Sequence, residues 1–335
     1  MESALTIRAP LLRARSMASA VLPLAVGPAI KTARFAPSLA MVVPMSVLVL
    51  IANPNEPVLS NALVETVQRE THGEINWLAQ GIACEIIAPK AADPVVMARE
   101  IIDSQPIDAA LVALANRRKQ LLVADMDSTM IEQECIDELA DALGLKPQVA
   151  EITERAMRGE LDFEAALDTR VALLKGLERK LVEDIRRERI TLAPGGRALI
   201  QTMKTHGAYT ALVSGGFTLF ADYFAKRIGF DEAIANILQF DSDDRLTGTV
   251  EKPIVDKTTK RNRLMALAGE KGLSIAQTMA VGDGANDLDM LQAAGLGVAI
   301  HAKPIVAEQA AVRIDHSDLT ALLYLQGYSD DDIVR

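Results

Sequence analysis

Hydrophobic positions between residues 46 and 114 follow two spacings in turn. Apolar, largely β-branched runs predict strands at 46–53, 75–80, 83–89 and 107–114. Two segments, 56–70 and 93–104, instead carry apolar residues at helical spacing. Asp93 is a suitable N-cap and Pro94 a suitable first residue for the second helix. The resulting order, β-α-β-β-α-β, is typical of the ferredoxin-like motif.

A different pattern begins at Leu121, after the polar linker ANRRKQ. Four short runs are apolar at nearly every position, as expected for strands that are covered on both faces of a parallel sheet: 121–125, 210–214, 279–283 and 296–300. The block of roughly 132–190 has no strand signal and holds three amphipathic helical segments, at 132–143, 147–157 and 162–177. Segment 236–256 predicts a β-hairpin that turns near 243–245.

These patterns predict an α/β fold with a doubly wound parallel sheet at 118–335. A helical cap is expected to be inserted into it at about 133–192, and a ferredoxin-like α+β domain is expected at 45–117.

The first 44 residues differ from the rest of the chain. They contain five basic residues and one acid: Arg8, Arg13, Arg15, Lys31, Arg34 and Glu2. Such a composition resembles a transit peptide, and residues 17–30 resemble a weak signal h-region. Met45 directly precedes the first strand, so a start codon placed too early explains the segment as well. We favour a disordered extension or a misplaced start over a targeting segment.

Composition narrows the classes of partner. The chain has 335 residues, half of them hydrophobic, which is enough for a large core. Its net charge of −10 argues against a nucleic-acid surface. The two cysteines, Cys84 and Cys135, form neither a disulfide framework nor a zinc site and fit a reducing compartment. No apolar run has the length of a membrane span. We therefore expect a cytoplasmic protein without nucleic-acid or membrane partners.

Polar residues gather where the predicted core strands end. Asp125 and Asp127 follow the first strand, Ser214 closes the second, and Asp283 closes the third. Ligands of open α/β sheets bind at the carboxyl ends of the strands, so these groups are expected to converge if the strands are neighbours. Two further polar side chains follow closely in VGDGAND, namely Asn286 and Asp287.

A cluster of this kind suits phosphoryl transfer. Mg²⁺ prefers oxygen ligands, and the absence of His or Cys from the motifs argues against zinc. Ser214 and the glycine N–H groups after it can hold phosphate oxygens. A lysine at a helix start, Lys260 or its competitor Lys257, would supply positive charge. Asp125 could then attack phosphorus as a nucleophile, with Asp127 as general acid and base.

Each motif alone is weak, because D-x-D and Ser-Gly-Gly most often form turns or helix caps. Together DMDSTMI, ALVSGG, Lys260 and VGDGAND resemble the four motifs of the haloacid-dehalogenase-like phosphatase superfamily. D-x-D-S-T resembles in particular its phosphoserine phosphatase group, and MRGELDFEAALDTRVALLKGL resembles that group's cap segment. The similarity covers about 118–325. The domain containing INWLAQGIACEI resembles the ACT-like domain of bacterial members.

The resemblance implies roles for individual residues. Asp125, Asp283 and the backbone carbonyl of Asp127 would bind Mg²⁺, supported by Asp287. Lys260 is preferred to Lys257 because it lies 23 residues before Asp283, the spacing of the family. The implied substrate-binding residues are Ser214, Gly215, Lys260 and Asn286 in the core and Glu134, Arg170, Met157 and Phe163 in the cap. Glu134 would bind the substrate ammonium and Arg170 its carboxylate, while Met157 and Phe163 would shield the site.

The implied activity is Mg²⁺-dependent hydrolysis of O-phospho-L-serine to L-serine and phosphate through an aspartyl phosphate, the last step of serine biosynthesis. Two alternatives stay open at this point. The same aspartyl phosphate could serve a phosphotransferase, or the chain could be an amino-acid-binding regulatory protein. A homodimer is compatible with the sequence, which does not fix the oligomeric state.

Overall fold

The computed structural model describes residues 45–157 and 160–335, which belong to one compact unit. The segment 1–44, for which the sequence predicts a disordered extension or a misplaced start, lies outside the described residues. Within the described part, no helix combines the length and the apolar character that a membrane crossing requires.

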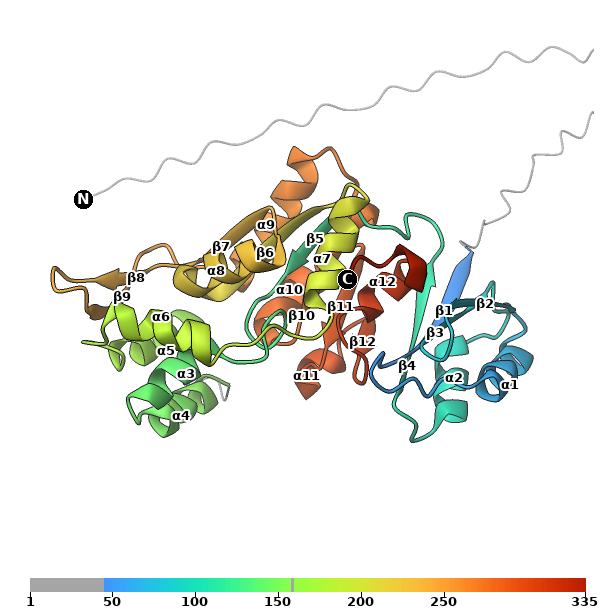
Figure 1. The fold of residues 1–335 in the computed structure, drawn as a ribbon, viewed down its shortest axis with the longest axis horizontal. Helices are drawn as coiled ribbons and strands as arrows, with labels where there is room; N and C mark the ends of the chain where they lie inside the picture. The colour runs from blue at the N-terminus through green and yellow to red at the C-terminus, as the bar shows by residue number, and fades with distance from the viewer. Residues whose placement is uncertain (1–44, 158–159) are drawn as a thin grey trace, which may run out of the picture. The chain divides into compact units, whose positions relative to one another are not determined.

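Residues 46–113 form a four-stranded antiparallel sheet with two helices (Figure 1). The elements are β1 (Ser46–Ala52), α1 (Asn61–Thr71), β2 (Glu74–Ala79), β3 (Ala83–Ile87), α2 (Pro94–Ile102) and β4 (Ile107–Ala113), with strand order β2-β3-β1-β4. The predicted order of elements is confirmed. Helix α1 begins later than the periodicity predicts because Ser60 caps it, accepting a hydrogen bond from the Leu63 N–H.

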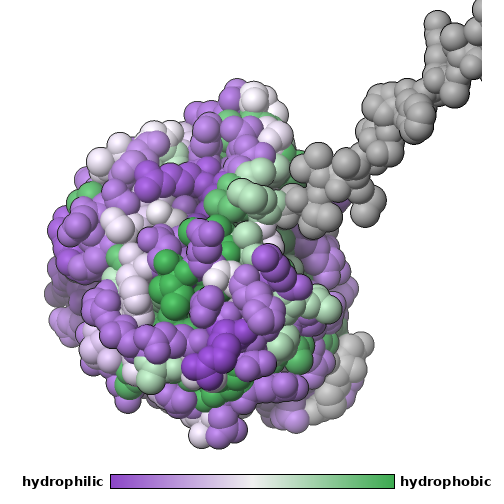
Figure 2. Space-filling view, turned by 90° about the vertical axis from the view of Figure 1, so that its right-hand side faces the viewer, coloured by the Kyte–Doolittle hydropathy of each residue, from purple (hydrophilic) through white to green (hydrophobic). Residues whose placement is uncertain are grey.

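This small sheet is covered on both faces. Leu48 and Leu50 of β1 pack with the two helices, whereas Val47 and Val49 belong to the large core cluster that includes Leu322 of α12 (Ala321–Leu325). One face of the sheet is therefore part of the large hydrophobic core, and the other face forms a smaller core with α1 and α2. The face of the molecule seen in Figure 2 is mainly hydrophilic, with smaller hydrophobic areas between the polar residues.

The second sheet has six parallel strands in the order β12-β11-β10-β5-β6-β7 (Figure 1). They are β5 (Leu121–Ala124), β6 (Tyr209–Phe217), β7 (Glu232–Asn236), β10 (Thr278–Gly282), β11 (Leu296–Ile300) and β12 (Val312–Ile314). The helices between them are α7 (Gly196–Thr205), α8 (Thr218–Ile228), α9 (Lys257–Glu270), α10 (Leu288–Ala293) and α11 (Pro304–Ala307). The predicted doubly wound α/β class is confirmed.

Two of the strands and one strand end differ from the sequence prediction. The edge strands β7 and β12 were not predicted, because they are short and only partly buried, so they lack a continuous apolar run. The second predicted strand was expected to end at Ser214, but β6 continues to Phe217. Its pairing with β7 is irregular between Val213 and Phe217, which sets Ser214 within the irregular stretch.

In the described residues between β5 and α7, where the sequence predicts a cap, there are four helices, which we call the cap helices. They are α3 (Cys135–Ala142), α4 (Lys146–Met157), α5 (Phe163–Ala172) and α6 (Arg179–Glu188). The predicted hairpin, β8 (Leu238–Phe240) with β9 (Leu246–Val250), lies beside α5 and α6 (Figure 1). Backbone bonds join Leu246 to Gly176 and Leu177, and the Lys252 ammonium lies 2.7 Å from a Glu164 oxygen. The hairpin thus ties the cap helices to the core sheet.

Candidate functional site

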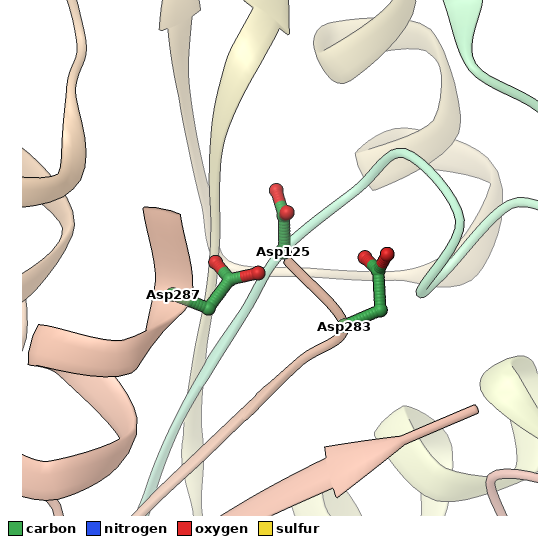
Figure 3. Close-up of side chains that lie close together, drawn as sticks. All are labelled: Asp125, Asp283 and Asp287. Atoms are coloured by element: carbon green, nitrogen blue, oxygen red, sulfur yellow. The ribbon is translucent and has the colours of Figure 1, made fainter. Parts of the chain in front are cut away.

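Three buried carboxylates meet at the carboxyl ends of two core strands. Asp125 directly follows β5 and Asp283 directly follows β10, and these two strands are parallel neighbours in the sheet. Asp287 ends the short helix η2 (Ala285–Asp287). One oxygen from each of the three lies within 4.8 Å of the others (Figure 3). The structure therefore brings Asp125 together with two acids that lie more than 150 positions later in the sequence.

Lys260 neutralises part of this cluster. Its ammonium is fully buried and lies 2.7 Å from an oxygen of Asp125 and 2.7 Å from an oxygen of Asp287. Burial alone would lower the pKa of Lys260, but the charges of the two carboxylates outweigh it and hold that pKa above its ordinary value. The competing Lys257 is exposed, and its ammonium lies 4.0 Å from Asp289. Only Lys260 of the two lysines therefore contacts the acid cluster.

The cluster retains more negative charge than one ammonium can balance. Burial raises the pKa of Asp125 well above its ordinary value, and the nearby charge of Asp287 adds to this effect. Burial and Asp287 likewise raise the pKa of Asp283 to about 6. Carboxylates held this close in a buried site favour either protonation or a bound cation.

The oxygens available to a cation can be identified from the hydrogen bonds. Asp287 has both oxygens engaged, one by Lys260 and the other by the Gly284 N–H at 3.0 Å. Asp125 uses Oδ1 for Lys260 and the Met126 N–H, so its Oδ2 is outside these bonds among the described residues. Asp283 accepts a bond only from Thr129, at 3.1 Å, among the side chains described. An all-oxygen set with Asp125 and Asp283 as ligands fits a hard divalent cation, with Asp287 in support.

Asp127, two residues after Asp125, contacts the first residue of the cap helix α3. Its Oδ1 accepts a hydrogen bond from the Cys135 N–H at 3.0 Å, and its Oδ2 lies 3.5 Å from the Ser214 hydroxyl, which donates to it. Desolvation raises the pKa of Asp127 to about 7, and the charge of Glu134 contributes in the same direction. A carboxyl group with this pKa can hold or release a proton near neutral pH.

Ser214, Gly215 and Gly216 form the wall beside Asp127. The Ser214 hydroxyl accepts a bond from the Gly216 N–H at 2.9 Å. The ring of Phe163, the first residue of α5, packs directly on Gly215, because a Cβ placed there would lie 3.2 Å from the ring's Cζ. Phe163 thus covers this end of β6 from the cap side, where the sequence predicts a shielding residue.

Gly216 has no room for a side chain, which leads to a prediction. A Cβ at Gly216 would lie 2.4 Å from Oδ2 of Asp127 and 3.0 Å from Cε of Met126. We expect G216A to displace the Asp127 carboxylate and to lower turnover of a phosphate monoester by about 100-fold, the cost of a misplacement of about 1 Å. The measurement is steady-state kinetics beside a thermal unfolding curve.

A matched glycine variant controls for the loss of glycine itself. Gly269 in α9 has no atom within 4 Å of a built Cβ, so G269A should leave turnover unchanged and add about 0.5–1 kcal/mol of helix stability. Equal turnover in G216A and G269A would show that Asp127 does not depend on the close approach of Gly216.

Asn236 joins two of the segments that are predicted to bind phosphate, and no sequence pattern indicated this role. Its side chain is 2% exposed at the end of β7. The amide Nδ2 donates to the Gly215 carbonyl at 2.8 Å, and Oδ1 accepts from the Val255 N–H at 2.7 Å. Val255 leads into α9, which carries Lys260. Asn236 therefore sets the spacing between the Ser214–Gly216 end of β6 and the helix of the buried lysine.

Removing this amide should weaken phosphate binding. N236A leaves the Gly215 carbonyl and the Val255 N–H without their partner, at a cost of about 1–3 kcal/mol for each unsatisfied group. We expect inhibition by inorganic phosphate to weaken by about tenfold or more, since 1.4 kcal/mol corresponds to a factor of ten. The control N76A removes a partly buried amide that bonds Glu85 in the small sheet, and it should leave phosphate inhibition unchanged.

Of the remaining residues predicted for the site, Glu134, Arg170 and Asn286 lie near it. Glu134 precedes α3 and is half-buried, and its Oε1 accepts from the Ser128 hydroxyl at 3.0 Å. Arg170 of α5 donates to Thr153 Oγ1 at 3.4 Å. Burial lowers the pKa of Arg170, and the negative charges of Glu134 and Asp137 oppose this effect. Asn286 is half-buried in η2 beside Asp287. Met157 ends α4, and its side chain lies outside the described residues.

Two side chains near the acids were missed by sequence reasoning. The Thr129 hydroxyl donates to Asp283, and Thr129 is part of the DMDST motif, so the motif could have indicated it. The Lys303 ammonium lies 3.9 Å from both Asp283 Oδ2 and Glu134 Oε1. No local pattern marks Lys303, because it reaches the site only through the position of the loop after β11.

The fold and the site together define a class: a parallel α/β protein with a carboxylate and lysine cluster at its strand ends and helices inserted after the first core strand. The family model of the haloacid dehalogenase-like hydrolases matches residues 122–292, about half of the chain. The chain belongs to this family.

Individual known proteins are also similar to this chain. The phosphoserine phosphatase of Streptomyces coelicolor is 47% identical over 229 residues, which are 68% of this chain and 55% of that protein. The chain thus spans little more than half the length of this relative. A solved structure of a probable phosphoserine phosphatase from Vibrio cholerae is 33% identical with a TM-score of 0.70, covering 86% of this chain and 88% of the other. A structure of a phospho-aspartyl intermediate analogue of phosphoserine phosphatase is 40% identical with a TM-score of 0.57. The match covers 62% of this chain and 98% of the other chain.

Proposed function

We propose that the protein is a Mg²⁺-dependent phosphoserine phosphatase, which hydrolyses O-phospho-L-serine to L-serine and phosphate. The observation that carries the proposal is the buried group of Asp125, Asp283, Asp287 and Lys260, with Asp127 beside it. The relatives named phosphoserine phosphatase support the choice of substrate. When bound by Asp125, Asp283 and the Asp127 carbonyl, Mg²⁺ would offset negative charge on the phosphoryl oxygens.

In this proposal Asp125 is the nucleophile. Its carboxylate oxygen forms a bond to phosphorus while the bond from phosphorus to the serine oxygen breaks, which gives an aspartyl phosphate. Asp127, with its pKa near 7, gives a proton to the leaving serine oxygen. It then takes a proton from the water that attacks phosphorus. The bond between phosphorus and the Asp125 oxygen breaks, so phosphate is released, Asp125 is again a carboxylate and Asp127 is again protonated. Ser214 and Lys260 hold the phosphoryl oxygens.

The cap helices would select the amino-acid part of the substrate. Glu134 offers a carboxylate to an ammonium group, and Arg170 offers a guanidinium to a carboxylate. Both are half-buried and act on each other electrostatically. Phe163, packed on Gly215, would exclude water from the same space.

Removing Arg170 should separate selectivity from chemistry. We expect R170A to lower kcat/KM for phosphoserine by about 100-fold, as is typical for the loss of one partner of a buried charge pair. Hydrolysis of p-nitrophenyl phosphate, which has no carboxylate, should change less than about threefold by the same reasoning. The matched control is R189A, which removes an exposed arginine of the cap region and should affect neither substrate. Equal losses on both substrates would reject Arg170 as the carboxylate-binding residue.

The experiment that tests the proposed function is phosphate release from phosphoserine, phosphothreonine, p-nitrophenyl phosphate and a sugar phosphate, each with Mg²⁺ and with EDTA. Metal-dependent release that strongly favours phosphoserine supports the proposal. Metal-dependent release without this preference would reject phosphoserine as the substrate but would still support a phosphatase. No release from any of the four would reject the phosphatase and direct attention to a phosphotransferase.

We further propose that residues 45–117 are an ACT-like domain. The support is the element order β-α-β-β-α-β and the similarity to the Vibrio cholerae structure over most of this chain. A homodimer and a cytoplasmic location stay predictions of the sequence.

A further inference from the structure

A cavity of about 390 Å³ lies between the small sheet and the core sheet. It is lined by the end of β4, the linker after it, α10 and the starts of β11 and β12. Lys119 precedes β5, Gly295 precedes β11 and Ala311 precedes β12, so the cavity is at the amino ends of the core strands. The acid cluster follows the carboxyl ends of the same sheet. The cavity is therefore separate from the site described above.

The lining of this cavity is mostly apolar with a few polar groups. Leu111, Leu288 and Leu291 provide hydrocarbon walls, and Gln292 and Gln309 provide exposed amides. Pockets for small molecules typically measure about 300–1,000 Å³, are mainly apolar, and occur preferentially between domains. The size, composition and position of this cavity fit that class of site.

Lys119 is the unusual member of the lining. Lys119 is 8% exposed, and its ammonium donates a hydrogen bond to the Ala276 carbonyl at 2.7 Å. An ammonium has three donors, and no carboxylate pairs with this one among residues 45–157 and 160–335. Burial of this ammonium lowers the pKa of Lys119 below its ordinary value, and no paired carboxylate among the described residues opposes the effect. The neighbouring Arg117 differs, because it lies 2.5 Å from a Glu85 oxygen and also donates to the Tyr324 and Leu325 carbonyls.

We propose that this cavity binds a small aliphatic carboxylate, with its carboxylate at Lys119 and its hydrocarbon part against the leucine walls. A single negative charge would supply the counter-charge that Lys119 lacks. The apolar walls would bury the rest of the ligand. Inorganic phosphate fits less well, because it would place a doubly charged group against leucine side chains. Arg117 also lines the cavity but is already paired with Glu85, which leaves Lys119 to balance that charge.

The experiment uses the full chain and 4-methylpentanoate as the probe. Saturable binding by calorimetry, with a Kd on the order of 1 mM and a concentration-dependent rise in Tm, is expected. The uncharged 4-methylpentanol and the cationic 4-methylpentylamine keep the hydrocarbon part, and both should bind at least about tenfold more weakly, the factor that corresponds to 1.4 kcal/mol. Absence of saturable binding, or equal binding of the three probes, overturns the proposal.

Two variants locate the ligand. K119M keeps a side chain of similar length without the charge, so it should weaken binding at least about tenfold. The fold should stay intact, because the substitution removes a buried charge that has no counter-ion among the described residues. L111W starts from a position that is 38% exposed and should block binding by filling the cavity from its β4 wall. Unchanged binding in both variants would overturn the assignment.

A further control separates this cavity from the acid cluster. D125N changes the acid cluster alone and should bind 4-methylpentanoate as the unmodified protein does. Competition between the probe and inorganic phosphate, or loss of binding in D125N, would place the ligand at the acid cluster and overturn the proposal.

Discussion

D125N is expected to abolish phosphate release, lowering turnover on the order of 10⁴-fold or more, as the removal of a nucleophile does in other enzymes with covalent intermediates. Asp125 is the carboxylate at the end of β5 that contacts Lys260, and its Oδ2 is outside the hydrogen bonds of the described residues. An amide in its place has no negative oxygen with which to attack phosphorus, so no aspartyl phosphate can form. The measurement is turnover of phosphoserine and of p-nitrophenyl phosphate under saturating Mg²⁺.

The fold should survive this change, which makes the result interpretable. Asparagine has the same shape as aspartate, and its amide oxygen can still accept the bond from the Met126 N–H. The variant loses one charge contact with Lys260 but also relieves repulsion with Asp287 and Asp283. We therefore expect D125N to unfold within a few degrees of the unmodified protein.

A matched change and a trapping experiment complete the test. D289N alters a half-buried aspartate of α10 that is not part of the acid cluster, and it should retain full turnover. Acid quenching during turnover of ³²P-labelled substrate should leave label on the unmodified protein and none on D125N. Substantial turnover by D125N, or label that persists in it, would exclude Asp125 as the nucleophile.

How far the sequence alone leads can be judged from Asp125, Ser214 and Asp283. Their convergence was predictable because each follows or ends a buried apolar run, and the carboxyl ends of neighbouring parallel strands share one edge of a sheet. Lys260 was harder, since Lys257 occupies an equivalent place in the sequence. The structure separates them by burial, because Lys260 is buried against two carboxylates and Lys257 is exposed.

Other features had no local signal. Asn236 acts through a strand end whose partners, Gly215 and Val255, are 21 and 19 residues away. Gly216 is restricted by the side chain of Asp127, which is 89 residues away in the sequence. Such constraints arise only once β6, β7 and α9 are packed together. The edge strands β7 and β12 were missed for a related reason, since partial burial removes the apolar run by which a strand is identified.

Replacing Lys260 by methionine should damage both stability and activity. K260M leaves Asp125 and Asp287 buried without the ammonium that lies 2.7 Å from each. Removing one partner of a buried ion pair typically lowers the free energy of unfolding by about 3–5 kcal/mol. Turnover should fall on the order of 10³-fold, as for the loss of one preorganised group that stabilises charge in the transition state. Denaturant unfolding and steady-state kinetics measure the two effects.

A double variant can distinguish the two roles of this lysine. In K260M/D287N one of the two stranded carboxylates becomes neutral, so part of the lost unfolding free energy should return. Turnover should not return, because neither change restores positive charge next to Asp125 and the phosphoryl group. K257M is the matched control for removing a lysine from the first turn of α9, and it should alter neither quantity because that lysine is exposed. Recovery of turnover in the double variant would show that Lys260 only balances Asp287 and does not act on the phosphate.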